Sequence, residues 1–231
     1  MSASNVLLLP GMMCDERLWA HQIAAIGVPT HVADTGKSDN FKEMAAQVLA
    51  EAPPKFAMAG LSMGGILAFE IWRQAPGRVT HLALLDTNPY PDAPEKKQVR
   101  FEEIAMAASG NLHRLAVESL KPKYLAKKNR DNENLLETIL DMALQLGPEV
   151  FERQSLAVLN RRDSMPTLPT ISCPTSVICG REDAICPVRF HQVMADQIAD
   201  ATLVIIDECG HLSSMEQPAL VTQELLRLFA L

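Results

Sequence analysis

Short runs of consecutive apolar residues alternate along this chain with longer segments in which apolar positions recur every three or four residues. Continuous apolar runs are typical of parallel strands that are buried on both faces, and the longer spacing is typical of helices that bury one face. Strands are therefore predicted at residues 6–9, 28–33, 55–61, 79–85, 175–179 and 202–206. Helices are predicted between and after them at residues 16–26, 40–52, 64–74, 188–198 and 218–229.

This alternation stops between residues 88 and 165, where no strand-like run occurs. Helical spacing is found there at residues 95–109, 112–120, 133–146 and 149–159, the last of them opened by Pro148. Such a block cannot belong to the sheet. We expect an α/β fold with a doubly wound, mostly parallel sheet of about six strands in a core of residues 1–87 and 166–231. Residues 88–165 are expected to form a helical insertion.

Charge and composition narrow the expected partners and location. The net charge is −7 and no long basic run occurs, so neither nucleic acid nor an anionic membrane is an expected partner. No apolar run approaches the length of a membrane span. The first basic side chain is Arg17, which is unlike a signal peptide, and five irregularly spaced cysteines are unlike a disulfide framework. We therefore expect a cytoplasmic protein with reduced thiols.

The segment Gly60-Leu61-Ser62-Met63-Gly64 joins a predicted strand to a predicted helix. Glycines two residues before and after the serine allow the strand and the helix to approach each other closely. This arrangement raises the hydroxyl at the tip of the strand, above the N-terminus of the helix. The five-residue pattern alone also arises by chance in glycine-rich turns, but the strand before it and the helix after it make it more specific. Ser62 is therefore a candidate nucleophile.

A serine hydroxyl becomes a good nucleophile only when a base removes its proton and a carboxylate orients that base. Asp183 follows the strand predicted at 175–179, and His211 follows the strand predicted at 202–206. Both should reach the sheet edge that carries Ser62, because the carboxyl ends of parallel strands meet there. Asp86, after the strand at 79–85, is the alternative acid. No spaced ligand set or phosphate-binding loop occurs, so neither a metal nor a cofactor is expected.

These segments together resemble the α/β-hydrolase superfamily. The resemblance rests on Leu8-Leu9-Pro10-Gly11, Gly60 to Gly65, Gly180-Arg181-Glu182-Asp183 and Gly210-His211. It implies that Ser62 is the nucleophile, His211 the general base and acid, and Asp183 the orienting carboxylate. It also implies that residues 88–165 form a cap over the site and that the two leading strands of the full fold are absent.

The resemblance further implies an oxyanion hole made of two backbone N–H groups. One is expected from Met63, directly after the nucleophile, and the other from Met12, after Pro10-Gly11, with Met13 as the alternative. Pro10 stands where many members of the superfamily have histidine. The donors are main-chain groups, so the activity should survive this difference.

We expect a serine hydrolase that cleaves a small apolar carboxylic ester, or a related acyl compound, through an acyl-enzyme. The fold tolerates many chemistries, and two other interpretations remain open. One is a lyase that uses Ser62 and His211 as a base without an acyl intermediate. The other is a receptor that binds a small molecule on the same fold.

Overall fold

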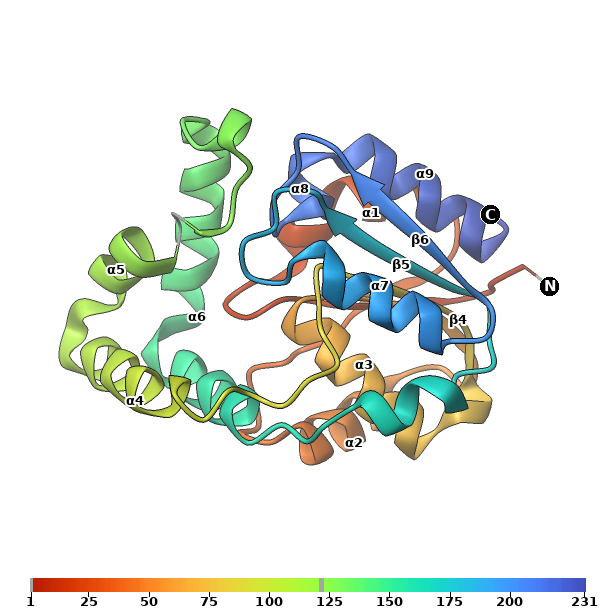
Figure 1. The fold of residues 1–231 in the computed structure, drawn as a ribbon, viewed down its shortest axis with the longest axis horizontal. Helices are drawn as coiled ribbons and strands as arrows, with labels where there is room; N and C mark the ends of the chain where they lie inside the picture. Colours follow the sequence, from red (N-terminus) through yellow and green to blue (C-terminus); the bar gives the residue numbers. More distant parts are fainter. Residues whose placement is uncertain (1, 121–122) are drawn as a thin grey trace.

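The computed structural model describes residues 2–120 and 123–231 (Figure 1). Its centre is one sheet in the order β2-β1-β3-β4-β5-β6, in which every neighbouring pair is parallel. The strands are β1 (Val6–Leu9), β2 (Thr30–Val32), β3 (Phe56–Leu61), β4 (Val79–Leu85), β5 (Thr175–Gly180) and β6 (Ala201–Ile206). The predicted α/β fold is therefore confirmed, with a wholly parallel sheet of six strands.

Helices cover both faces of the sheet, and each face has its own core. On one face α1 (Ala20–Ala25) and α9 (Pro218–Phe229) pack against the strands, and on the other α2 (Phe41–Glu51), α3 (Met63–Gln74) and α7 (Val188–Gln197) do so (Figure 1). In β1, Val6 and Leu8 belong to the first core, whereas Leu7 and Leu9 belong to the second. Both faces of the central strands are thus apolar, which explains the continuous runs in the sequence.

Two helical segments begin at the capping residues that the sequence predicted. Asn40 precedes α2, and its side chain accepts a hydrogen bond from the Glu43 N–H at 2.9 Å. Asp15 accepts one from the Arg17 N–H at 2.9 Å, but the chain first makes a 3₁₀ turn over Glu16–Trp19 before α1 begins. The helix predicted at residues 16–26 is therefore shorter than expected.

The inserted segment, residues 88–165, forms helices α4 (Lys96–Met106), α5 (Leu112–Leu115) and α6 (Glu133–Leu159). Wider π-helical turns continue α4 over Ala107–Asn111 and α5 over Ala116–Leu120. The two helices predicted at 133–146 and 149–159 run on as α6, which is interrupted at Gly147, where φ is 82°. Pro148 follows that break, as expected of a helix start. Lys121 and Pro122, within the inserted segment, lie outside the described residues.

The helices of the inserted segment gather beside the carboxyl ends of β5 and β6, with α4 and α5 packed against α6 (Figure 1). A small apolar cluster joins them to the loop after β1 through Met13, Ala107, Leu112, Leu115, Ala143 and Phe151. The short helix α8 (Ser213–Glu216) and the 3₁₀ turns at Pro76–Arg78, Lys127–Asn129 and Met165–Thr170 were not predicted. Within the described ranges, no helix is both long and apolar enough to cross a membrane.

Candidate active site

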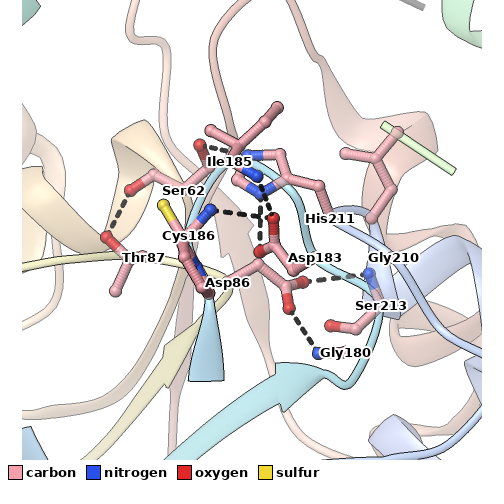
Figure 2. A network of polar contacts seen from close by, with 12 residues as sticks. Ser62, Asp86, Thr87, Gly180, Asp183, Ile185, Cys186, Gly210, His211 and Ser213 are labelled. Atoms are coloured by element: carbon pink, nitrogen blue, oxygen red, sulfur yellow. Dashed lines mark hydrogen bonds and ion pairs between the residues drawn. The ribbon is translucent and has the colours of Figure 1, made fainter. Parts of the chain in front are cut away.

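Ser62 occupies a strained turn between β3 and α3. Its φ is 54° and its ψ is −113°, a combination that non-glycine residues rarely adopt. The surrounding backbone holds it there. The Ser62 N–H donates to the Leu85 carbonyl at 2.9 Å, and the Thr87 hydroxyl donates to the Ser62 carbonyl at 2.8 Å (Figure 2).

The glycines around Ser62 are required by close backbone contacts. A Cβ atom at Gly64 would lie 2.0 Å from the carbonyl oxygen of Leu9, and one at Gly60 would lie 2.4 Å from the carbonyl oxygen of Gly64. No side chain fits at either position. The loop after β1 and the start of α3 consequently touch through their backbones, which brings their N–H groups close to the serine.

The structure brings Ser62, His211 and Asp183 together in one hydrogen-bonded row (Figure 2). His211 Nε2 lies 2.8 Å from Ser62 Oγ, and His211 Nδ1 lies 2.8 Å from Asp183 Oδ2. The other oxygen of Asp183 accepts from the N–H groups of Ile185 and Cys186, both at 2.8 Å. These bonds fix the carboxylate, which in turn fixes the imidazole ring.

His211 is 3% exposed. Burial alone would lower its pKa, but the charge of Asp183 and the hydrogen bond to that carboxylate outweigh burial and raise the pKa above its ordinary value. A histidine with a raised pKa is a stronger base towards the serine hydroxyl.

Asp86, the alternative acid, contacts other partners. Its side chain is fully buried and accepts hydrogen bonds from the Gly180 N–H at 3.1 Å and the Ser213 N–H at 3.0 Å (Figure 2). It thus ties together the loops that carry Asp183 and His211. Burial, together with the charge of Asp183, raises its pKa. His211 is paired with Asp183 and not with Asp86.

Both residues expected to supply N–H groups to an oxyanion hole belong to the lining of one cavity. Met12 and Met63 both line the cavity above Ser62, and no acceptor among the described residues bonds to either N–H. The N–H of Met13, the alternative donor, is already bonded to Gln154 Oε1 at 2.8 Å. Of the two neighbouring methionines, Met12 therefore has the N–H that is left for a ligand.

Sequence reasoning missed three residues that support the site. Gln154 is one, and nothing in its surrounding sequence distinguishes it from other helical glutamines. Glu216 is the second: it accepts from the Gly210 N–H at 2.9 Å and from the Ala126 N–H at 2.8 Å, so it joins the loop of His211 to the inserted segment. Tyr124 is the third. Its carbonyl accepts from the His211 N–H at 2.7 Å, and its ring stacks on the imidazole with centroids 6.0 Å apart.

A cavity of about 410 Å³ lies above Ser62. Its lining combines Ser62, His211, Met12 and Met63 with residues of the inserted segment, among them Val99 and Val158. A space of this size suits a small organic molecule.

One group of side chains in the described chain has metal-ligating atoms close together. The ligand atoms of Asp183, Cys186 and His211 lie within 4.8 Å of one another. Burial raises the pKa of the Cys186 thiol, with the charge of Asp183 acting in the same direction, so the thiol stays protonated and is a poor ligand. Asp183 and His211 are already bonded to each other. The group therefore fits a hydrogen-bonded triad better than a metal site.

Comparisons with known proteins point to one family. Residues 6–224 match the model of the alpha/beta hydrolase family. One relative is the pimeloyl-[acyl-carrier protein] methyl ester esterase of Aromatoleum aromaticum, which is 23% identical over 98% of this chain and 100% of its own length.

Solved structures give the same result. A thermophilic esterase from Thermogutta terrifontis, solved with malate bound, is 30% identical, with a TM-score of 0.88 over 99% of this chain and 91% of its own. The enol-lactonase of Burkholderia xenovorans is 22% identical, also with a TM-score of 0.88, over 100% and 93% of the two chains. At that identity, the second similarity supports the fold alone.

Proposed function

The chain belongs to the alpha/beta hydrolase family, and from that premise we propose that it is a serine hydrolase that cleaves small carboxylic esters through an acyl-enzyme. The observation that carries the proposal is the hydrogen-bonded row from Ser62 through His211 to Asp183, at the base of a cavity. The esterases among its relatives support ester cleavage as the reaction.

In the first half of the reaction, Ser62 Oγ attacks the ester carbonyl carbon while His211 Nε2 takes the hydroxyl proton. The carbonyl oxygen becomes an oxyanion, which accepts hydrogen bonds from the N–H groups of Met12 and Met63. Asp183 stabilises the imidazolium that forms. The C–O bond of the ester then breaks, and His211 returns the proton to the departing alcohol.

In the second half, a water molecule takes the place of the alcohol. His211 removes a proton from the water as its oxygen attacks the acyl carbon, and the same two N–H groups stabilise the second oxyanion. Breaking the bond to Ser62 Oγ returns the proton to the serine and releases the carboxylic acid.

We also propose that residues 88–165 act as a cap. Two observations support this role: Val99 and Val158 line the cavity above Ser62, and Tyr124 stacks on His211. Residues 1–87 and 166–231 then form the hydrolase core that carries the three reacting side chains.

Detection of the covalent acyl-enzyme tests the proposal. A slowly hydrolysed p-nitrophenyl ester is mixed with the protein, the mixture is quenched in acid at short times, and the intact mass is measured. We expect one acyl group per chain, none in Ser62→Ala, and a strongly reduced amount in His211→Ala. Ser109→Ala, which removes an exposed serine of the inserted segment, is the matched control and should be acylated like the parent protein.

Three results would speak against the proposal. Acylation that persists in Ser62→Ala would place the nucleophile elsewhere. Consumption of an elimination substrate, with esters untouched and no adduct, would identify a lyase. Saturable binding of small molecules with neither turnover nor adduct would identify a receptor.

A further inference from the structure

One wall of the cavity above Ser62 contains the charged residues Asp92, Arg100 and Arg161. The side chain of Asp92 is 1% exposed and lies between the two guanidinium groups. Arg100 Nε donates to Asp92 Oδ2, and Arg161 Nη1 lies 3.1 Å from Asp92 Oδ1. Two cations thus share one anion, which leaves an excess of one positive charge in a largely buried place.

The remaining charges of the lining do not remove this excess. Asp183, which is paired with His211, is not part of the lining. Apart from His211, the other charged or titratable side chains there include two lysines and two glutamates, which balance each other: Lys96, Lys123, Glu95 and Glu103. The local positive charge also contrasts with the net charge of −7 of the whole chain. An anion that enters the cavity is therefore attracted to the two arginines.

The two arginines differ in how far the protein already uses them. Arg161 is held by the backbone: its Nε donates to the Tyr90 carbonyl and its Nη1 to the Val158 carbonyl, both at 2.9 Å. Arg100 uses only Nε, and within the described ranges its two η nitrogens donate to no protein acceptor. Those nitrogens form the fork that binds a carboxylate or phosphate through two parallel hydrogen bonds.

A purely structural ion pair would need only one of these arginines. Arg161 alone would neutralise Asp92 and fasten the beginning of the inserted segment to its end, through Tyr90 and Val158. Arg100 adds a second cation, although uncompensated charge in a buried place is unfavourable. Burial lowers the pKa of Arg161, and the charge of Arg100 lowers it further. The charge of Asp92 acts in the opposite direction but does not outweigh them. A second anion at this place would relieve that repulsion.

Building on the proposed ester hydrolysis, we propose that the acyl part of the substrate ends in an anionic group that binds the η nitrogens of Arg100 beside Arg161. The ester carbonyl then lies at Ser62, and a short apolar chain between the two ends contacts Ile66, Val99 and Val158. The substrate class is the monoesters of small dicarboxylic acids or of their phosphono analogues.

The first experiment uses the parent protein and substrates matched in chain length. Monomethyl adipate carries a terminal carboxylate, methyl hexanoate lacks it, and methyl 5-phosphonopentanoate carries a phosphonate instead. We expect kcat/KM for the better of the two anionic esters to exceed that for methyl hexanoate at least about tenfold, mainly through KM, because a hydrogen bond to a charged group contributes about 1.5–3 kcal/mol. The two anionic substrates distinguish a carboxylate site from a phosphate site. Equal or better turnover of the neutral ester would overturn the inference while leaving ester hydrolysis in place.

The second experiment tests the arginine. Arg100→Gln should bring the ratio of kcat/KM between anionic and neutral esters close to one, and Arg100→Lys should keep part of it. Arg114→Gln is the matched control, since Arg114 is an exposed arginine of α5 that pairs with Glu118, and the ratio should not change. An unchanged ratio in Arg100→Gln, with thermal unfolding like that of the parent protein, would contradict the proposed role.

A binding measurement makes the anion site testable without turnover. Calorimetric titration of Ser62→Ala with adipate should give saturable binding that weakens at high salt, whereas hexanoate should bind at least about tenfold more weakly. In the double variant Ser62→Ala/Arg100→Gln, Kd for adipate should rise about tenfold or more. If adipate does not bind Ser62→Ala, the anion site is wrong even where neutral esters are hydrolysed. If adipate binds but no ester is hydrolysed, the proposed reaction is wrong and the anion site stands.

Discussion

Gln154 Oε1 accepts a hydrogen bond from the backbone N–H of Met13 at 2.8 Å, across 141 residues of sequence. The side chain is 1% exposed, and its nitrogen donates to the Thr35 hydroxyl at 3.1 Å. Met13 has a φ of 56°, so the loop after β1 is held in an unfavourable conformation. Helix α6 of the inserted segment therefore fixes the loop that presents the N–H of Met12.

Gln154→Ala should weaken both stability and catalysis. The N–H of Met13 loses its buried acceptor, which costs about 1–3 kcal/mol of unfolding free energy. The loop relaxes and moves the N–H of Met12, so we expect kcat to fall by at least about tenfold, since loss of one oxyanion donor costs about 10²–10³. Urea unfolding and steady-state kinetics measure the two effects. Gln192→Ala removes an exposed glutamine of α7 and should change neither. An unchanged kcat in Gln154→Ala would show that the loop keeps its position unaided.

Asp183→Asn should lower kcat by about 10⁴, because His211 loses the carboxylate that orients it and stabilises its charged form. Asp86→Asn should reduce kcat far less. Its carboxamide keeps one acceptor but turns an NH₂ group towards the other N–H, so the main loss is about 1–3 kcal/mol of stability. Kinetics and thermal unfolding of both variants test the assignment, and the reverse order of effects on kcat would make Asp86 the acid.

The pH dependence follows from the raised pKa of His211. The reaction needs the neutral imidazole, so kcat/KM should rise with pH through an apparent pKa above the ordinary value of about 6.5. Stability responds in the opposite sense. A pKa raised in the folded state contributes stability that is present below the unfolded value and lost as the pH rises through the folded value. A pH series of kcat/KM and of urea unfolding measures both trends.

The same series in Asp183→Asn supplies the control. Removing the charge of Asp183 leaves burial to dominate, so the ascending limb of the remaining activity should move to lower pH. If the activity of Asp183→Asn rose with pH over the same range as that of the parent protein, a group other than His211 would be responsible for the titration.

A substitution at Phe151 distinguishes a role in core packing from a role in substrate contact. It is 1% exposed, belongs to the apolar cluster with Met13 and Leu115, and is not part of the cavity lining. Phe151→Ala should therefore lower the free energy of unfolding by about 3–5 kcal/mol and leave the preferred acyl length unchanged. Val99→Trp fills part of the cavity and should shorten the preferred acyl chain. A series of esters of graded length, read beside urea unfolding, distinguishes the two results.

Local patterns predicted much of the sheet and its flanking helices. The apolar run at residues 6–9 matches β1, and the boundaries predicted for β4 and α9 agree with the structure. Buried parallel strands and amphipathic helices leave such patterns because each residue's environment is set by nearby spacing. Ser62, Asp183 and His211 could be predicted as a group because each lies at or a few residues beyond the carboxyl end of a strand of one parallel sheet.

Contacts across the fold left no comparable signal. Glu216 lies in the sequence between the last predicted strand and the last predicted helix, with nothing to mark it, yet its carboxylate contacts the N–H groups of Gly210 and Ala126. The extra charge at Arg100 became visible only when the fold placed it beside Asp92 and Arg161.

The double contact of Glu216 has a consequence for recombining this enzyme with its relatives. Its carboxylate anchors the loop of His211 through Gly210 and also holds Ala126 and Asn129, at 2.8 Å and 2.9 Å. A chimera that exchanged all of residues 88–165 would leave this half-buried carboxylate without Ala126 and Asn129 and would disturb the loop of His211. A chimera that exchanged only residues 112–122 would keep both partners of Glu216, Ala126 and Asn129. The part of the inserted segment that can be exchanged is therefore smaller than the whole of residues 88–165, and donor sequences should be chosen for that shorter stretch.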